Sequence, residues 1–212
     1  MSYIEVKNYT KKIKDNVILD NINLTLEKGK IYGFVGRNGS GKTMLFRAIC
    51  GLIRPTEGQV IIDGQTIAKD IDFPNSCGVI LETPGFWGDL TGFECLKNIA
   101  SINSKINEED INKWMIKLGL NPKDKRQFKK YSLGMKQKLA LVQAFMEEPE
   151  LIILDEPTNA LDEESIINLR DILMDFRKKG VTVLIASHNR SEIESLSDKI
   201  FNINLGKLKE VV

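Results

Sequence analysis

One stretch decides the fold of this chain: Gly36-Arg37-Asn38-Gly39-Ser40-Gly41-Lys42-Thr43. A phosphate group needs several donors converging on it, and backbone N–H groups supply them where glycine allows close approach and positive φ. Lys42 adds a positive charge for the β- and γ-phosphates, and the Thr43 hydroxyl is a ligand for Mg²⁺. An apolar strand over residues 31–35 precedes the stretch, and a predicted helix over residues 43–51 follows it and points its positive dipole end at the anion. This setting disfavours an ordinary glycine turn and predicts a site for the phosphates of a nucleotide triphosphate.

A pair of acidic residues follows a second apolar run. Residues 151–154 are predicted to form a buried strand, and Asp155 and Glu156 come directly after it. The end of such a strand delivers side chains to the edge of the sheet where ligands bind. A lone Asp-Glu pair at a strand end is usually a solvated turn. Beside a phosphate-binding loop, we expect Asp155 to hold the metal, directly or through water, and Glu156 to polarise an attacking water as general base.

Length and composition narrow the classes of function. The chain has 212 residues, which suits one domain with a sizeable subdomain and excludes a large multidomain machine. Its 30 Lys and Arg residues balance 29 Asp and Glu residues, so no global charge indicates nucleic-acid binding. Cys50, Cys77 and Cys95 have no CxxC spacing and are interpreted as reduced and structural. The N-terminus lacks a signal-peptide pattern and the longest apolar stretch, residues 181–186, is too short to cross a bilayer, so we expect a cytosolic chain.

Strands and helices are expected to alternate along the chain. Residues 3–9 and 21–26 alternate apolar and polar positions, as half-buried strands do, with a turn at residues 14–16 between them. Helical periodicity dominates from about residue 84 to residue 149, which indicates a helical insertion. Alternating elements predict an α/β fold with a mainly parallel sheet and right-handed crossovers. Further strands are expected at residues 60–62, 78–81, 181–186 and 200–203, and a helix at residues 164–179.

Five landmarks, in order, make this sequence resemble the nucleotide-binding domains of ABC (ATP-binding cassette) proteins over nearly the whole chain. The first is the glycine-rich loop, and the next three stand close together. They are Tyr131-Ser132-Leu133-Gly134-Met135-Lys136-Gln137 in the place of the LSGGQ signature, Leu154-Asp155-Glu156-Pro157-Thr158 as Walker B, and Asn159-Ala160-Leu161-Asp162 as D-loop. The fifth is Ser187-His188, in the place of the switch histidine.

The resemblance implies a P-loop NTPase fold and an ATPase that binds ATP and Mg²⁺. The fold would have a RecA-like core, an N-terminal antiparallel β-subdomain and an inserted helical subdomain. One domain would span residues 1–212, with its catalytic core at 1–83 and 150–212 and its helical subdomain at about 84–149.

The signature segment is predicted to form a second anion-binding helix terminus. Ser132 is a good N-cap for a helix through about Glu147, so its hydroxyl and the following N–H groups form such a terminus. In the family this site, with Gly134, closes on ATP bound to the opposing subunit, and Asp162 belongs to the same set of nucleotide contacts. Leu133 and Met135 depart from LSGGQ, a variant that resembles the cassettes of bacterial exporters for antimicrobial peptides, including the bacitracin and lantibiotic immunity group.

The family resemblance also predicts roles for three other positions. His188, the only histidine, would contact the γ-phosphate and orient the water, although a lone histidine is most often a packing or surface residue. Glu82 stands where the family usually has the Q-loop glutamine and could bind Mg²⁺ or water, or be an exposed loop acid. Ile13 stands where an aromatic usually stacks on adenine, with Tyr9 or Tyr3 as possible substitutes, so the phosphate contacts should dominate affinity and the preference for ATP over GTP stays open.

The expected function is that of a transporter cassette. Two cassettes, as a homodimer or a heterodimer, would bind ATP and Mg²⁺ and power a separate membrane permease, which holds the chain at the inner face of the cell membrane. Export is preferred, the cargo is open, and no nucleic-acid partner is expected; the alternatives are a non-transport ABC ATPase acting on nucleic acid or an assembly partner, and a regulatory module without turnover. Two other surface features carry open alternatives. Phe86 and Trp87 either anchor the helical insertion or line a docking groove for the permease. The basic run at residues 123–130 is a solvated face or contacts anionic lipid.

Overall fold

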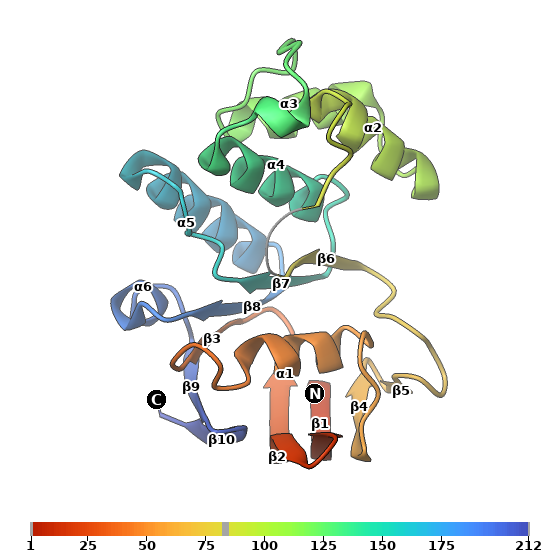
Figure 1. Ribbon diagram of the computed structural model, residues 1–212, viewed down its shortest axis with the longest axis vertical. Helices are drawn as coiled ribbons and strands as arrows, with labels where there is room; N and C mark the ends of the chain where they lie inside the picture. The colour runs from red at the N-terminus through yellow and green to blue at the C-terminus, as the bar shows by residue number, and fades with distance from the viewer. Residues whose placement is uncertain (1, 82–84, 212) are drawn as a thin grey trace.

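Two β-sheets and a cluster of helices make up the computed structural model, which describes residues 2–81 and 85–211 (Figure 1). The strands are β1 (Ser2–Ile13), β2 (Asn16–Glu27), β3 (Ile31–Val35), β4 (Glu57–Ile62), β5 (Gln65–Thr66), β6 (Cys77–Ile80), β7 (Leu151–Asp155), β8 (Thr182–Ser187), β9 (Lys199–Asn204) and β10 (Lys207–Glu210). The helices are α1 (Lys42–Ile49), α2 (Gly92–Asn103), α3 (Glu108–Lys117), the 3-10 helix η1 (Phe128–Lys130), α4 (Leu133–Phe145), α5 (Glu163–Lys178) and α6 (Arg190–Glu194).

The larger sheet is mainly parallel. Its strand order is β10-β9-β3-β8-β7-β6, and every neighbouring pair is parallel except β9 with β10. All residues of β3, β7 and β8 are buried, as expected for strands that are covered on both faces. The predicted α/β fold class with a mainly parallel sheet is confirmed.

The smaller sheet is antiparallel and has the order β2-β1-β4-β5. Its two long strands extend well beyond the predicted residues 3–9 and 21–26. The pairing of β1 with β2 contains register shifts, and Asn8 and Asn21 lie at φ values of 48° and 49°. Such bulges interrupt the alternation of inward and outward side chains, which explains why pattern alone found only part of each strand.

Helix α1 lies between the two sheets. Its Leu45, Phe46 and Ile49 are buried in a cluster that joins the antiparallel sheet to one face of the parallel sheet. On the opposite face, α5 and the helices α2, α3 and α4 form a second cluster, where the rings of Trp114 and Phe176 stack with centroids 5.7 Å apart. In Figure 1 the helices between β6 and β7 stand at the far end of the molecule from β1 and β2.

Three short elements escaped the sequence prediction. Strand β5 has only two residues, and β10 is polar and exposed along most of its length. Helix α6 is a single short turn of five residues after β8. Neither a two-residue strand nor one helical turn produces a measurable period, and a polar edge strand lacks the apolar signal on which strand prediction depends.

Candidate functional site

The site lies at one edge of the parallel sheet, where three strands end. Val35 pairs with Ser187 and Asp155 pairs with Ala186, so the last residues of β3, β7 and β8 lie side by side. The glycine-rich loop, Glu156 and His188 follow these three strand ends directly. Parallel pairing therefore brings together segments that are more than a hundred residues apart in the sequence.

The loop has the backbone conformation that its glycines allow. Gly41, the N-cap of α1, has φ 114°, and a Cβ on Gly36 would lie 2.4 Å from the carbonyl oxygen of Ile203. Glycine is therefore required at Gly41 by its dihedral angle and at Gly36 by close packing. Lys42 is only 6% exposed, and its Nζ donates to the carbonyl oxygen of Gly36 at 2.8 Å. A buried ammonium held by carbonyl oxygens is in position to exchange them for phosphate oxygens.

Thr43 and Asp155 provide the donor set for a divalent cation. The Thr43 hydroxyl donates to the Asp155 carboxylate, which is itself buried. Hydroxyl and carboxylate oxygens are hard ligands, and Mg²⁺ typically takes one or two of them together with phosphate oxygens and waters. The residues present therefore fit Mg²⁺. Glu82, the third predicted metal residue, lies outside the described residues.

Glu156 contacts two other predicted site residues, His188 and Lys42. Its Oε2 lies 2.8 Å from Nδ1 of His188, and its Oε1 lies 3.7 Å from Nζ of Lys42. Its backbone has φ 49°, in the left-handed region that few residues other than glycine adopt, and its N–H donates to Ala186 at 2.8 Å. Strain of this kind is kept where the surrounding structure requires it, and it often marks functional positions.

The signature and the D-loop meet each other rather than the glycine-rich loop of the same chain. Ser132 caps α4 by accepting from the Met135 N–H at 3.2 Å, and a Cβ on Gly134 would lie 2.8 Å from the carbonyl oxygen of Ala160. Asp162 caps α5, and hydrogen bonds from the hydroxyl and N–H of Ser165 lower the pKa of its carboxyl. None of the three predicted contacts, Ser132, Gly134 and Asp162, lines the pocket at the glycine-rich loop.

That pocket has a volume of about 290 Å³ and contains most of the predicted site. It is lined by Ile18, Asn38, Gly39, Ser40, Gly41, Lys42, Thr43, Met44, Asp155 and Glu156. Arg37 is exposed beside it, and the Arg37 carbonyl oxygen accepts from the Ser40 N–H at 3.1 Å. The Ser40 Oγ is buried and has no hydrogen-bond partner among the described residues, so it is available to an anion.

Sequence reasoning missed Ile18 and Met44, which line this pocket with apolar side chains. The suggestion that Tyr9 or Tyr3 replaces an adenine-stacking aromatic is wrong, because both are buried in the antiparallel sheet and burial raises the pKa of each to about 12. Ile13 is 46% exposed at the end of β1. Ile18 lies five residues after Ile13, across the turn, and a single isoleucine within a β-strand carries no signal that could have distinguished it.

The two apolar residues after the Q-loop position behave differently. The ring of Phe86 packs edge-on against Phe128 at 5.1 Å, which matches the interpretation as an anchor for the helical insertion. Trp87 is 53% exposed. In the basic run, Arg126 and Lys129 form ion pairs with Asp124 and Asp89, as solvated surface residues commonly do.

Comparison with known proteins shows the family. The family described as ABC transporter matches residues 19–159. The uncharacterized ABC transporter ATP-binding protein YybJ of Bacillus subtilis is 46% identical over 97% of this chain and 94% of its own length. Bacitracin transport ATP-binding protein BcrA of Enterococcus faecalis is 40% identical over 99% of this chain and 68% of its own length. Lantibiotic transport ATP-binding protein SrtF of Streptococcus pyogenes is 36% identical over 97% and 88%.

Solved structures agree with this fold. The ATP-binding subunit of an ABC transporter superposes with a TM-score of 0.89 at 26% identity, covering 99% of this chain and 90% of that structure. A dimeric ATP-binding cassette in a post-hydrolysis state with ADP and Pi gives a TM-score of 0.88 at 22% identity, covering 98% and 97%. The resemblance to ABC nucleotide-binding domains, including those of the bacitracin and lantibiotic group, is confirmed. This chain belongs to the ABC transporter family and is one of its ATP-hydrolysing, ATP-binding domains.

Proposed function

We propose that this chain is the energy-supplying subunit of an exporter, with its ATPase site at the sheet edge formed by β3, β7 and β8. The observation that supports the site best is the convergence of Lys42 and His188 on the single carboxylate of Glu156. The catalytic core at residues 1–83 and 150–212 would hold the nucleotide, and the helical subdomain at about 84–149 would present the signature to a second cassette.

The residues of this chain divide the reaction between them. The backbone N–H groups of residues 36–43 bind the phosphates, and Lys42 leaves the Gly36 carbonyl to neutralise the β- and γ-phosphate charge. Thr43 and Asp155 would hold Mg²⁺, which neutralises charge on the phosphate oxygens when it is bound. Glu156 accepts a proton from the attacking water, and His188 orients Glu156 through the contact at Nδ1. Ile18 supplies the apolar surface beside the nucleoside.

Each glycine-rich loop would be half of a complete site. Ser132 and Gly134 lie at the exposed or partly exposed start of α4, away from the pocket of their own chain. The free N–H groups of that helix start can bind an anion presented by another molecule. A head-to-tail dimer, with itself or with a related cassette, would place them on the opposing ATP, with Asp162 at the same interface. Leu133, 63% exposed where the family has glycine, would also face that partner.

The names of the relatives support a peptide antibiotic or similar molecule as cargo. BcrA and SrtF are named for bacitracin and lantibiotic transport. None of the helices in the described part of the chain has both the length and the apolar character needed to cross a membrane. In this proposal a separate permease would carry the cargo and hold this chain at the inner face of the membrane.

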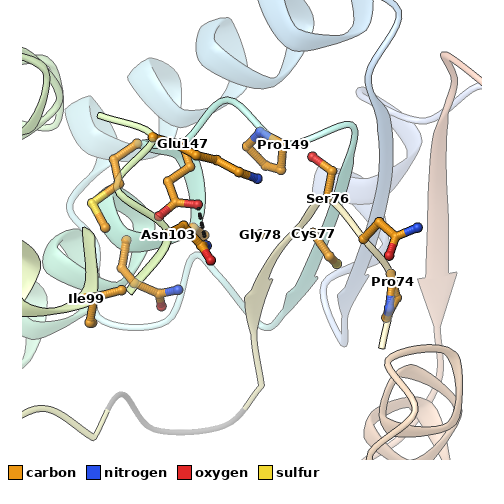
Figure 2. Close-up of a pocket in the computed structure, with 13 residues that line it drawn as sticks. Pro74, Ser76, Cys77, Gly78, Ile99, Asn103, Glu147 and Pro149 are labelled. Atoms are coloured by element: carbon orange, nitrogen blue, oxygen red, sulfur yellow. Dashed lines mark hydrogen bonds between the residues drawn. The ribbon is translucent and has the colours of Figure 1, made fainter. Parts of the chain in front are cut away.

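A hollow at the junction between the helices and the sheet is the surface we assign to the permease. It is lined from the sheet side by Ser76, Cys77 and Gly78, and from the helical side by Asn103 and Glu147, whose side chains are joined by a hydrogen bond of 2.9 Å (Figure 2). A segment bound there would touch both parts of the chain. Movement of the helices on the sheet would therefore reach the permease.

Replacing Lys42 with Ala is expected to weaken ATP binding on the order of 10- to 100-fold, because one charge-assisted contact to the phosphates is lost. Isothermal titration calorimetry with the ATP-Mg²⁺ complex measures the change. Lys69→Ala, an exposed lysine elsewhere on the surface, is the matched control. Unchanged affinity in Lys42→Ala would rule out the glycine-rich loop as the phosphate site.

Glu156→Gln should lower ATP turnover about 10²- to 10⁴-fold while leaving ATP binding largely intact, because the amide cannot accept the proton from water. Steady-state phosphate release gives the turnover, and gel filtration with ATP should show an accumulated dimer. Glu164→Gln, at an exposed acid in the first turn of α5, should behave as the wild type. Turnover near the wild-type rate in Glu156→Gln would remove this residue as general base.

Glu147→Arg should abolish co-purification with the membrane permease, because it places a large side chain of opposite charge in the junction hollow. The ATPase rate of the isolated chain should not change. Glu148→Arg is the control, since the neighbouring Glu148 is exposed and pairs with Lys179 instead of lining the hollow. Retention of the permease by Glu147→Arg would place the docking surface elsewhere, and failure of the wild-type chain to retain any permease would favour a non-transport role.

A further inference from the structure

The turn between β9 and β10 lies against the glycine-rich loop. The Gly206 N–H in this turn donates to the carbonyl oxygen of Ser40 at 2.9 Å, and the Gly206 carbonyl accepts from the Asp20 N–H at 2.9 Å. One peptide segment therefore connects the loop to β2. The first hydrogen bond of α1, from Leu45 to Gly41, begins after Ser40, so the Ser40 carbonyl lies outside the helix and receives its partner from the hairpin.

The contact is close enough to require glycine. Gly206 has φ 73°, and a Cβ there would lie 2.4 Å from the carbonyl oxygen of Ile18 and 3.3 Å from Cα of Leu19. On the loop side, a Cβ on Gly41 would lie 3.3 Å from Cδ2 of Leu19, 3.4 Å from the same Ile18 oxygen and 3.6 Å from Cα of Gly206. The loop, β2 and the hairpin thus meet in close contact, with the Leu19 side chain packed beside their backbones.

The hairpin that carries this turn is itself anchored. β10 pairs with β9, the Val211 N–H donates to Ile200 at 2.9 Å, and Lys199 forms an ion pair with Glu210 at 2.9 Å. Nζ of Lys207 lies 3.4 Å from Oδ2 of Asp20, the residue whose N–H donates to the Gly206 carbonyl. A turn held on both sides in this way can hold the loop in a fixed position.

We propose that Gly206 is a positioning residue for nucleotide binding: its peptide holds Ser40, and with it the loop of residues 36–43, in the conformation that receives the phosphates. The inference rests on the proposed nucleotide site and adds a segment far from it in sequence. Binding of a triphosphate depends on N–H groups that already converge, so loosening the loop is expected to reduce affinity more than it slows the bound nucleotide's reaction.

Gly206→Ala tests this role against Gly64→Ala. Gly64 has φ 77°, close to that of Gly206, but a Cβ there would meet nothing within 4 Å. Both variants place alanine at positive φ, so the comparison isolates the collision with Ile18. We expect Gly206→Ala to raise the Kd and KM for ATP about tenfold, with kcat at saturation little changed, while Gly64→Ala matches the wild type. A folded Gly206→Ala with wild-type Kd would overturn the proposal.

Hydrogen exchange on the wild-type chain provides a readout that does not depend on the folding of a variant. ATP should slow amide exchange in the segment around Gly206 together with that of residues 36–43. Protection of the loop alone would overturn the role of Gly206. The proposed function fails in a distinguishable way, because then neither segment would be protected by ATP and Lys42→Ala would leave binding unchanged.

Discussion

The hydrogen bond from the Thr43 hydroxyl to the Asp155 carboxylate is the contact on which the rest of the site depends. It joins side chains separated by 112 residues, one at the start of α1 and one at the end of β7. The contact forms because β3 and β7 flank β8 in a parallel sheet, so the loop after one strand faces the acid that ends the other. The two oxygen ligands proposed for Mg²⁺ thus already lie together in the structure.

The charged side chains of Lys42 and Glu156 lie at the same edge of the sheet. Lys42 is buried against the Gly36 carbonyl and near Glu156, so its ammonium is already desolvated and its partners are weak acceptors or a single carboxylate. Phosphate oxygens offer this cation stronger partners than the carbonyl oxygens do. In the proposed mechanism, Glu156 would then be free to act on water, with His188 still beside it. Binding of the phosphates would thereby release the proposed base.

Much of this site could be predicted from sequence because its residues lie in short contiguous motifs. The loop of residues 36–43, the acids after residues 151–154 and the Ser132 cap each follow local rules of conformation and charge. Ile18 and Gly206 could not be found in this way, since the pocket that Ile18 lines and the hydrogen bonds of Gly206 exist only in the folded chain. The bulged strands β1 and β2 were underestimated for the same reason, because tertiary pairing sustains them where the side-chain pattern breaks.

A crystal structure of the chain with a non-hydrolysable ATP analogue and Mg²⁺ tests the central claim most directly. We predict that the triphosphate lies along residues 36–43, that Lys42 Nζ has moved from the Gly36 carbonyl to phosphate oxygens, and that Ser132 of a second copy contacts the γ-phosphate. A nucleotide bound elsewhere, or one bound while Lys42 keeps its contact with Gly36, would contradict this description of the site.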